Sequence, residues 1–199
     1  MYRIITIERQ YASGGNEIGK KLARELDYRF QDHSILVEAA KRLEIPSTYV
    51  EDLEETAPGS IIFNLSQTVL GGTVKNTNNL PLATRLFLEE KQIIEELVEK
   101  GNCVIVGRCA SAILKDRKDC LNVFIHADNE FRTKRAIEKE KISPHEVEAI
   151  LRKNDKRRSN FYQTHTNWTW GDKEHFHMIL DSGEIGIDKC IELLKITCK

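Results

Sequence analysis

Residues 2–18 read YRIITIERQYASGGNEI: a short apolar run, a polar loop with two glycines, and the start of a helical pattern. The run from Tyr2 to Ile7 is rich in β-branched residues, which is typical of a buried strand in a parallel sheet. From Ile18 to Leu26, apolar residues recur at helical spacing. A strand, a glycine-bearing loop and a helix in this order point backbone N–H groups and a helix N-terminus at an anion. The stretch between Ile7 and Ile18 therefore predicts a phosphate-binding loop.

Within this loop, Gly14 and Gly15 allow the backbone to approach phosphate oxygens without a Cβ clash, and Ser13 can add a hydroxyl donor. An ordinary strand-to-helix turn is the alternative interpretation, because short glycine motifs give many false positives. The segment from Gly14 to Lys21 also fits G-x-x-x-x-G-K, but lysine stands where that motif needs serine or threonine. We reject this match, because its Lys20 falls inside the amphipathic helix rather than at the helix mouth.

The rest of the chain alternates short apolar runs with helical patterns. Further strands are predicted at residues 28–30, 103–106, 121–126 and 176–180. Helices are predicted at residues 18–26, 35–43, 47–55, 82–100, 130–141 and 185–194, and from residue 143 towards 161. Strands separated by helices indicate an α/β fold with a central five-stranded parallel sheet and right-handed crossovers. We expect a single domain over residues 1–199.

Two local patterns refine this outline. The sequence Ser-Pro-His-Glu at residues 143–146 has the form of a capping box with proline at the first helical position, so it predicts a helix start. Residues 71–81 are the most loop-like part of the chain, and their order is left open.

Composition excludes several classes of function. The chain has 199 residues, 40% hydrophobic and 31% charged, with a formal net charge of −1, so we expect neither nucleic-acid nor membrane-surface binding. It carries no long apolar run or signal-peptide pattern. Its five cysteines form no CxxC pair, which favours free thiols in a reducing cytoplasm. His175 and His177 lack a third ligand nearby in sequence, so no protein-held metal site is predicted.

Residues 5–18 strongly resemble the opening of the cytidylate kinase-like family, relatives of bacterial cytidylate kinase. The likeness continues in the same order through residues 28–32, 106–108, 123–128, 154–160 and 179–182, so it spans nearly the whole chain. Each of these landmarks is weak by itself, but the ordered set is fairly specific.

The resemblance implies a three-layer P-loop kinase fold with a helical lid. It places a helical insertion that binds the acceptor at residues 44–84 and the lid at residues 152–175. It further implies ATP and Mg²⁺ as cofactors and a nucleoside monophosphate kinase-like phosphotransferase acting on a cytidylate-type nucleotide or a related small acceptor. The oligomeric state is left open.

Carried over by position, the resemblance also assigns site residues. The phosphate-binding set is Ser13, Gly14, Gly15, Asn16 and Glu17. The acceptor-binding set is Asp32, Arg85, Gly107 and Arg108, and the lid set is Arg152, Asp155, Arg157 and Arg158. Phosphoryl transfer depends on positioning and on neutralising phosphate oxygens, which arginine forks do bidentately. Arg9, Arg108 and Arg157 are the residues expected to act in catalysis.

The chain departs from a working cytidylate kinase at several positions. Gly15 stands where the catalytic lysine should be, and Glu17 stands where the Mg²⁺-binding serine or threonine should be. Val106 and Cys109 replace the aspartates that flank the glycine–arginine pair. Arg9 leaves the strand on the ligand side and could supply the missing cation.

Three functions therefore compete. A phosphotransferase is the first, and a catalytically weak or inactive nucleotide or phosphate sensor is the second. The third and weakest is a protein-interaction role for an exposed patch around Trp168 and Trp170; the simpler account is that these tryptophans are buried or close the lid.

Overall fold

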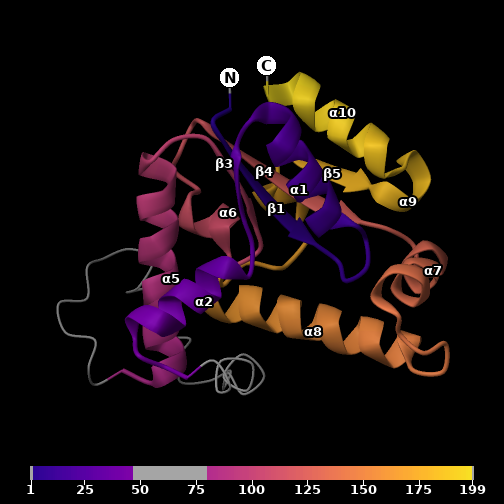
Figure 1. The fold of residues 1–199 in the computed structure, drawn as a ribbon, viewed down its shortest axis with the longest axis horizontal. Helices are drawn as coiled ribbons and strands as arrows, with labels where there is room; N and C mark the ends of the chain where they lie inside the picture. The colour runs from indigo at the N-terminus through magenta and orange to yellow at the C-terminus, as the bar shows by residue number, and fades with distance from the viewer. Residues whose placement is uncertain (1, 47–79, 199) are drawn as a thin grey trace.

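The computed structural model describes residues 2–46 and 80–198, and its centre is a sheet of five parallel strands in the order β2-β3-β1-β4-β5 (Figure 1). The predicted parallel sheet is confirmed. Because β1 is central, its carboxyl end lies between those of β3 and β4, where open parallel sheets bind ligands. The strands are β1 (Ile4–Arg9), β2 (Arg29–Gln31), β3 (Cys103–Val106), β4 (Cys120–His126) and β5 (Met178–Asp181).

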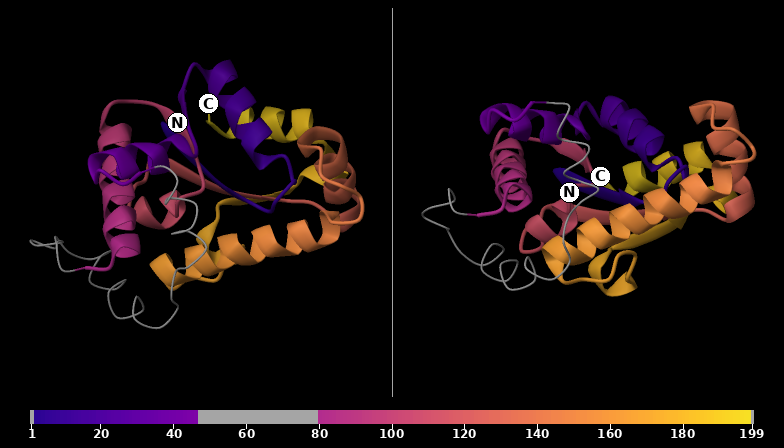
Figure 2. Two further views of the ribbon diagram at one scale, coloured as in Figure 1. Left: turned by 60° about the horizontal axis from the view of Figure 1, so that its bottom comes forward. Right: turned by 90° about the horizontal axis from the view of Figure 1, so that it is seen from below.

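Helices cover both faces of the sheet and give the three-layer architecture that the sequence predicted (Figure 2). Alternate residues of a strand point to opposite faces. Ile5 and Ile7 therefore pack against α1 (Gly15–Leu26) and α10 (Ile187–Cys198). Ile4 packs on the other side, against α2 (Ser34–Arg42), α5 (Leu82–Glu99) and α6 (Ala110–Ile113).

Helix α7 (Asn129–Glu140) and the 20-residue helix α8 (Val147–Thr166) follow β4 and form the part of the fold nearest the predicted phosphate loop. The backbone N–H of Tyr11 donates to Asp155 on α8 at 2.7 Å, and Arg158 of α8 donates to the carbonyl of Arg9 at 3.0 Å. These bonds hold α8 across the carboxyl end of β1. The segment after α8 contains a short 3-10 helix, η1 (Lys173–His175).

Both ends of α8 differ from the prediction. Residues 143–146 form a turn, with the N–H groups of Glu146 and Val147 both bonded to the carbonyl of Ser143, so the helix begins at Val147. The helix also continues past residue 161 and ends only at Asn167, which adopts a left-handed φ of 61°. Residues 162–166 stay helical because Tyr162, His165 and Thr166 are buried against the neighbouring layers.

Two short helices, α6 and α9 (Ser182–Ile185), were not predicted, since four residues are too few to show a helical period. The predicted helix at residues 47–55, and most of the predicted insertion 44–84 and of the loop 71–81, lie outside the described residues. Within the parts that are described, no helix has both the length and the apolar character needed to cross a membrane.

Candidate active site

The loop between β1 and α1 is held from the inside by two serine hydroxyls. Ser13 Oγ lies 2.9 Å from the carbonyl oxygen of Gln10 and 3.3 Å from that of Ile125. Ser182 Oγ lies 2.5 Å from the carbonyl oxygen of Ser13 and 3.0 Å from that of His126. The hydroxyl that the sequence offered as a phosphate donor is thus committed to the protein interior, and Ser13 shapes the loop rather than reaching outward.

Helix α1 begins at Gly15 with its N-terminus open. Gly14 precedes it with a left-handed φ of 83°, and no side chain caps the first turn. The first N–H groups of an α-helix have no partner within the helix and carry partial positive charge. The amides of Gly15, Asn16 and Glu17 therefore have no hydrogen-bond partner within the helix.

The polar side chains of this first turn bind other side chains. Asn16 donates to the carboxylate of Asp32 at 3.1 Å, which joins the loop to the end of β2. Glu17 accepts from Arg135 of α7 at 2.5 Å and pairs with Lys21 at 2.9 Å. Lys21 first, and Arg135 second, hold the pKa of Glu17 below its ordinary value. Glu17 is thus an ion-paired carboxylate on the α7 side of the loop.

Arg9, the last residue of β1, fills the space above the loop. A Cβ atom at Gly15 would lie 2.5 Å from Cβ and 2.8 Å from Cγ of Arg9, far inside van der Waals contact. A Cβ at Gly107, whose φ is 79°, would overlap the guanidinium of the same side chain. Glycine at position 15 is what allows the stem of Arg9 to lie there, whereas the guanidinium beside Gly107 is the flexible end of the side chain. The stem of Arg9 therefore occupies the room that a longer side chain at position 15 would need.

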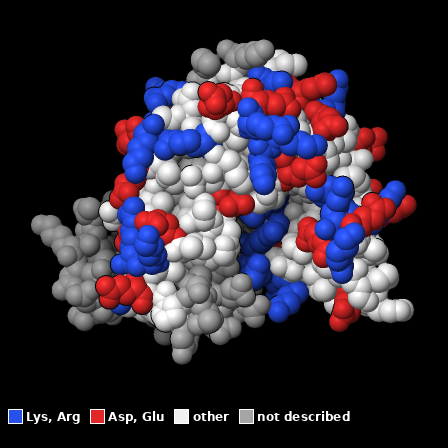
Figure 3. Space-filling model, in the orientation of Figure 1, with Lys and Arg blue, Asp and Glu red and all other residues white. Residues whose placement is uncertain are grey.

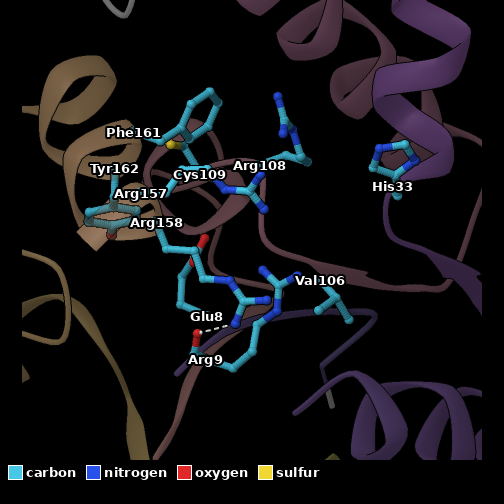
Figure 4. Close-up of a pocket in the computed structure, with 10 residues that line it drawn as sticks. All are labelled: Glu8, Arg9, His33, Val106, Arg108, Cys109, Arg157, Arg158, Phe161 and Tyr162. Carbon is cyan, nitrogen blue, oxygen red and sulfur yellow. Dashed lines mark hydrogen bonds between the residues drawn. The ribbon is translucent and has the colours of Figure 1, made fainter. Parts of the chain in front are cut away.

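Four arginines converge on one cavity of about 110 Å³ at the carboxyl end of β1 (Figure 4). In the space-filling view, basic side chains also gather in a hollow of the surface (Figure 3). The cavity is smaller than the roughly 300–1,000 Å³ of typical ligand pockets, so it suits a phosphoryl group rather than a whole nucleotide. Its lining residues are Glu8, Arg9, His33, Val106, Arg108, Cys109, Arg157, Arg158, Phe161 and Tyr162.

Arg108 is held in place by a strained turn and by two side chains. Gly107, Arg108 and Cys109 have successive φ values of 79°, 59° and 56°, and such left-handed conformations cost non-glycine residues of order 1–3 kcal/mol each. The guanidinium forms an ion pair with the fully buried Glu90 of α5 and lies 4.4 Å from the ring centre of Phe161. This support fixes the direction in which Arg108 faces the cavity.

Arg158 and Arg157 reach the cavity from α8. Arg158 donates to the carbonyl of Arg9 at 3.0 Å and lies 5.3 Å from the ring centre of Tyr11. Burial, and next the nearby Arg9 charge, lower the pKa of Arg158 to about 9. Arg157 donates to Asn154 at 3.4 Å. Charge on Arg158 is thus disfavoured until an anion arrives, which is the electrostatic condition for binding phosphate.

The other arginine and carboxylate positions from the sequence lie apart from this cavity. Arg152 is 75% exposed on α8, at 3.8 Å from Glu148. Asp155 accepts from Arg132 at 2.5 Å as well as from the loop backbone, so it anchors α8 to the loop. Arg85 lies half-buried on α5, and its Nε makes no hydrogen bond within the part of the chain described.

Sequence reasoning missed several lining residues. Glu8 had one available signal, because it is an acidic residue next to the apolar run that forms β1. Phe161 and Tyr162 had none, since the helix was predicted only towards residue 161 and no motif marks either ring. Trp168 and Trp170 are half-buried: Trp168 stacks on His175, while Trp170 packs edge-on against an aromatic ring of β4.

The described residues do not fit a Mg²⁺ ion held by the protein alone. No three His, Cys, Asp or Glu side chains within residues 2–46 and 80–198 are grouped to bind a metal. Glu17 stands at the expected position, but its carboxylate binds Lys21 and Arg135. In proteins Mg²⁺ is commonly bound through one or two carboxylates together with substrate phosphates.

Comparison with known proteins identifies relatives of this fold. An uncharacterised protein from Eubacterium ventriosum superposes with a TM-score of 0.73 at 23% identity, covering 98% of this chain and 97% of that one. Shikimate kinase from Acinetobacter baumannii, in complex with shikimate, gives a TM-score of 0.55 at 15% identity over 99% and 93% of the two chains. TT1252 from Thermus thermophilus gives 0.57 at 15% identity over 100% and 98%.

These identities are low enough that the structures establish the fold alone. A comparison with curated proteins gave no significant match. The sequence profile of the cytidylate kinase-like family, however, matches residues 4–184. The chain therefore belongs to the cytidylate kinase-like family and has a P-loop kinase fold.

Proposed function

We propose that this protein is a phosphotransferase that takes a phosphoryl group from ATP, supplied with Mg²⁺, and passes it to a cytidylate-type nucleotide or a related small acceptor. The observation that carries this proposal is the convergence of four arginines beside the open N-terminus of α1. Family membership supports kinase-like chemistry, and the arginines supply the charge that such chemistry needs.

The geometry supports the following proposed division of labour. The amides of residues 15–17 hold the donor phosphates. Arg9 supplies the positive charge of the catalytic lysine, which is replaced by Gly15 in this chain. Arg157 and Arg158 contact the transferred phosphoryl group from α8, in the proposed lid 152–175. Arg108, fixed by Glu90, faces the acceptor. A guanidinium fork binds phosphate oxygens in pairs, so this set can neutralise a developing phosphate charge.

The test is release of ADP from ATP and Mg²⁺ in the presence of a panel of nucleoside monophosphates and small alcohols. Arg157→Met should lower kcat by about 10²–10³-fold, the usual loss when one electrostatic contact to a transition state is removed. Lys156→Met is the matched control, because Lys156 is an exposed basic residue of the same helix. Absence of turnover above a buffer control for every acceptor would refute the proposal.

A sensor without catalysis is the second candidate, and the ion pairs of Glu17 favour it. With its carboxylate bound to Arg135 and Lys21, this residue does not replace the hydroxyl that ordinarily handles the metal in a cytidylate kinase. Titration calorimetry with ATP and with monophosphates distinguishes the two candidates. Tight binding without turnover identifies a sensor. If the protein binds neither ATP nor any monophosphate, the sensor is ruled out.

We also propose that the protein works in the cytoplasm. All five cysteines are free and buried, which suits a reducing compartment.

A further inference from the structure

Glu8 is a buried carboxylate at the end of β1 that the proposed division of labour leaves unused. The residue is only 5% exposed, and its side chain lines the arginine cavity beside Arg9, Arg108 and Arg158 (Figure 4). Its Oε2 atom accepts from the indole N–H of Trp170 at 3.4 Å. Its Oε1 atom is buried and accepts no hydrogen bond from any described residue.

An unpaired carboxylate oxygen in a dry site is unfavourable, because the atom has given up its hydrogen bonds to water without replacement. Because Glu8 lines the cavity, the missing donor can arrive with a ligand. Phosphate oxygens are acceptors and carry negative charge, so they do not satisfy it. A hydroxyl group does, since its O–H donates to the carboxylate.

The groups that face Glu8 allow it to accept a proton. Burial raises the pKa of Glu8 above its usual range, while Arg9, Trp170, Arg158 and Arg108 oppose that rise. The other titratable groups beside it, the Cys109 thiol and the Tyr162 hydroxyl, have pKa values raised by burial and stay neutral. Among the described lining residues Glu8 is the carboxylate of this cavity, while His33, the lining imidazole, is an exposed residue on the other side of it (Figure 4). Glu8 is thus the buried group that can take a proton from a ligand beside the arginines.

We propose that Glu8 is the catalytic base of this protein and that the acceptor presents a hydroxyl group, not a phosphate, to the transferred phosphoryl group. The acceptor class is therefore an alcohol, such as a sugar or nucleoside hydroxyl. The acceptor oxygen forms a new bond to the γ-phosphorus of ATP, its proton passes to Glu8 Oε1, and the bond between the γ-phosphorus and the β–γ bridging oxygen breaks. ADP leaves with that electron pair. This inference rests on the proposed function and, of the two acceptors named there, selects a related small acceptor with a hydroxyl over the phosphate of a cytidylate-type nucleotide.

Glu8→Gln is the decisive variant. Glutamine keeps the size of the side chain and can still accept from Trp170, but it cannot take a proton. We expect kcat to fall by about 10²–10⁴-fold with little change in the KM for ATP. The control is Glu148→Gln, which alters a carboxylate that is 79% exposed on α8. Thermal melts of both variants separate a loss of folding from a loss of chemistry.

A pH profile of the wild-type protein keeps the inference testable if Glu8→Gln does not fold. A base must be deprotonated to act, so kcat/KM should fall as the pH drops through a pKa above the ordinary value of 4.5 for a glutamate. In a folded Glu8→Gln variant this acid limb should be absent. An acid limb that persists unchanged in the variant contradicts the assignment.

The acceptor panel separates the possible failures. It contains cytidine and glycerol as alcohols and CMP as a phosphate acceptor. Transfer to an alcohol hydroxyl with loss in Glu8→Gln supports the inference. Transfer to the phosphate of CMP with full activity in Glu8→Gln refutes it and leaves the proposed function standing. Absence of transfer to every acceptor refutes the proposed function, and the inference about Glu8 fails with it.

Discussion

Replacing Arg158 with methionine should stabilise the ligand-free protein and yet weaken its response to ATP. The variant keeps most of the aliphatic stem but removes a guanidinium that is disfavoured by burial and by Arg9, which together lower its pKa from 12.5 to about 9. A protein that holds an unfavourable charge in place for a ligand gives up stability for binding. Arg158 is therefore expected to be unfavourable before ATP binds and favourable afterwards.

The magnitude follows from the pKa. A lowering from 12.5 to about 9 corresponds to an unfavourable contribution of at most about 5 kcal/mol, at about 1.4 kcal/mol per pH unit. Arg158 keeps partial contact with solvent, which screens its charge, so we reduce this unfavourable contribution to about half. The variant also loses the hydrogen bond from Arg158 to the carbonyl of Arg9, which reduces the gain in stability by roughly 1.5 kcal/mol. The net gain is of order 1 kcal/mol, or about 2–4 °C in Tm for a chain of this size.

Calorimetric melts with and without ATP and Mg²⁺ measure the stability of the ligand-free protein and its stabilisation by ATP. ATP at about 100 times its Kd should stabilise the wild-type protein by about 2.7 kcal/mol. Loss of one charged contact weakens binding by about 1.5–3 kcal/mol, so the same ATP concentration should shift the variant much less. The order of the two Tm values should reverse on adding ATP. The control Lys156→Met should have the same Tm values as the wild type. An Arg158→Met variant whose Tm is lower than that of the wild type without ATP, and rises as much as that of the wild type with ATP, would refute the reasoning.

Three further predictions concern the loop, α8 and the thiols. Gly15→Ala should lower the free energy of unfolding in urea by about 1–3 kcal/mol through its clash with Arg9, and an Arg9→Gly background should remove that loss. Asp155→Ala should cost about 3–5 kcal/mol, because it leaves the buried Arg132 charge without its carboxylate; a loss under about 1 kcal/mol contradicts this. Burial raises the pKa of all five thiols, so a colorimetric thiol reagent at pH 8 should react rapidly only after denaturation.

The sheet could be predicted from the sequence because its strands are short runs of β-branched and apolar residues. The run at residues 103–106 matches β3 at both ends, since a buried parallel strand has apolar side chains on both faces. The loop after β1 was predictable for a similar reason, because two glycines between a strand and a helical period leave few other structures. Helix α8 was misjudged at both ends, since its polar N-terminal turn resembles a cap and its last turn is buried by distant parts of the chain.

The contacts that shape the site could not be predicted, because they join residues far apart in the sequence. Glu8 meets Trp170 across 162 positions, and the hydroxyl of Ser13 is taken by the carbonyl of Ile125 across 112. Arg108, in the turn after β3, is paired with Glu90 on α5, a partner that no local pattern specifies. A single sequence reveals which residues can carry charge near a loop. It does not reveal which of those charges are already neutralised by a neighbour.

Gly15 and Arg9 are best understood as one arrangement rather than as a lost lysine and an extra arginine. The stem of Arg9 occupies the space that a side chain at position 15 would need. The cationic side chain of this loop can therefore come from the end of β1 or from the start of α1, but not from both. At Gly15 a side chain would meet the Cβ and Cγ atoms of Arg9, whereas at Gly107 it would meet only the guanidinium, which is the flexible end of that side chain. Arginine also differs from lysine in binding oxygens as a planar fork. The absence of lysine at Gly15 therefore agrees with the proposed role of Arg9 as the cation that holds phosphate in this loop.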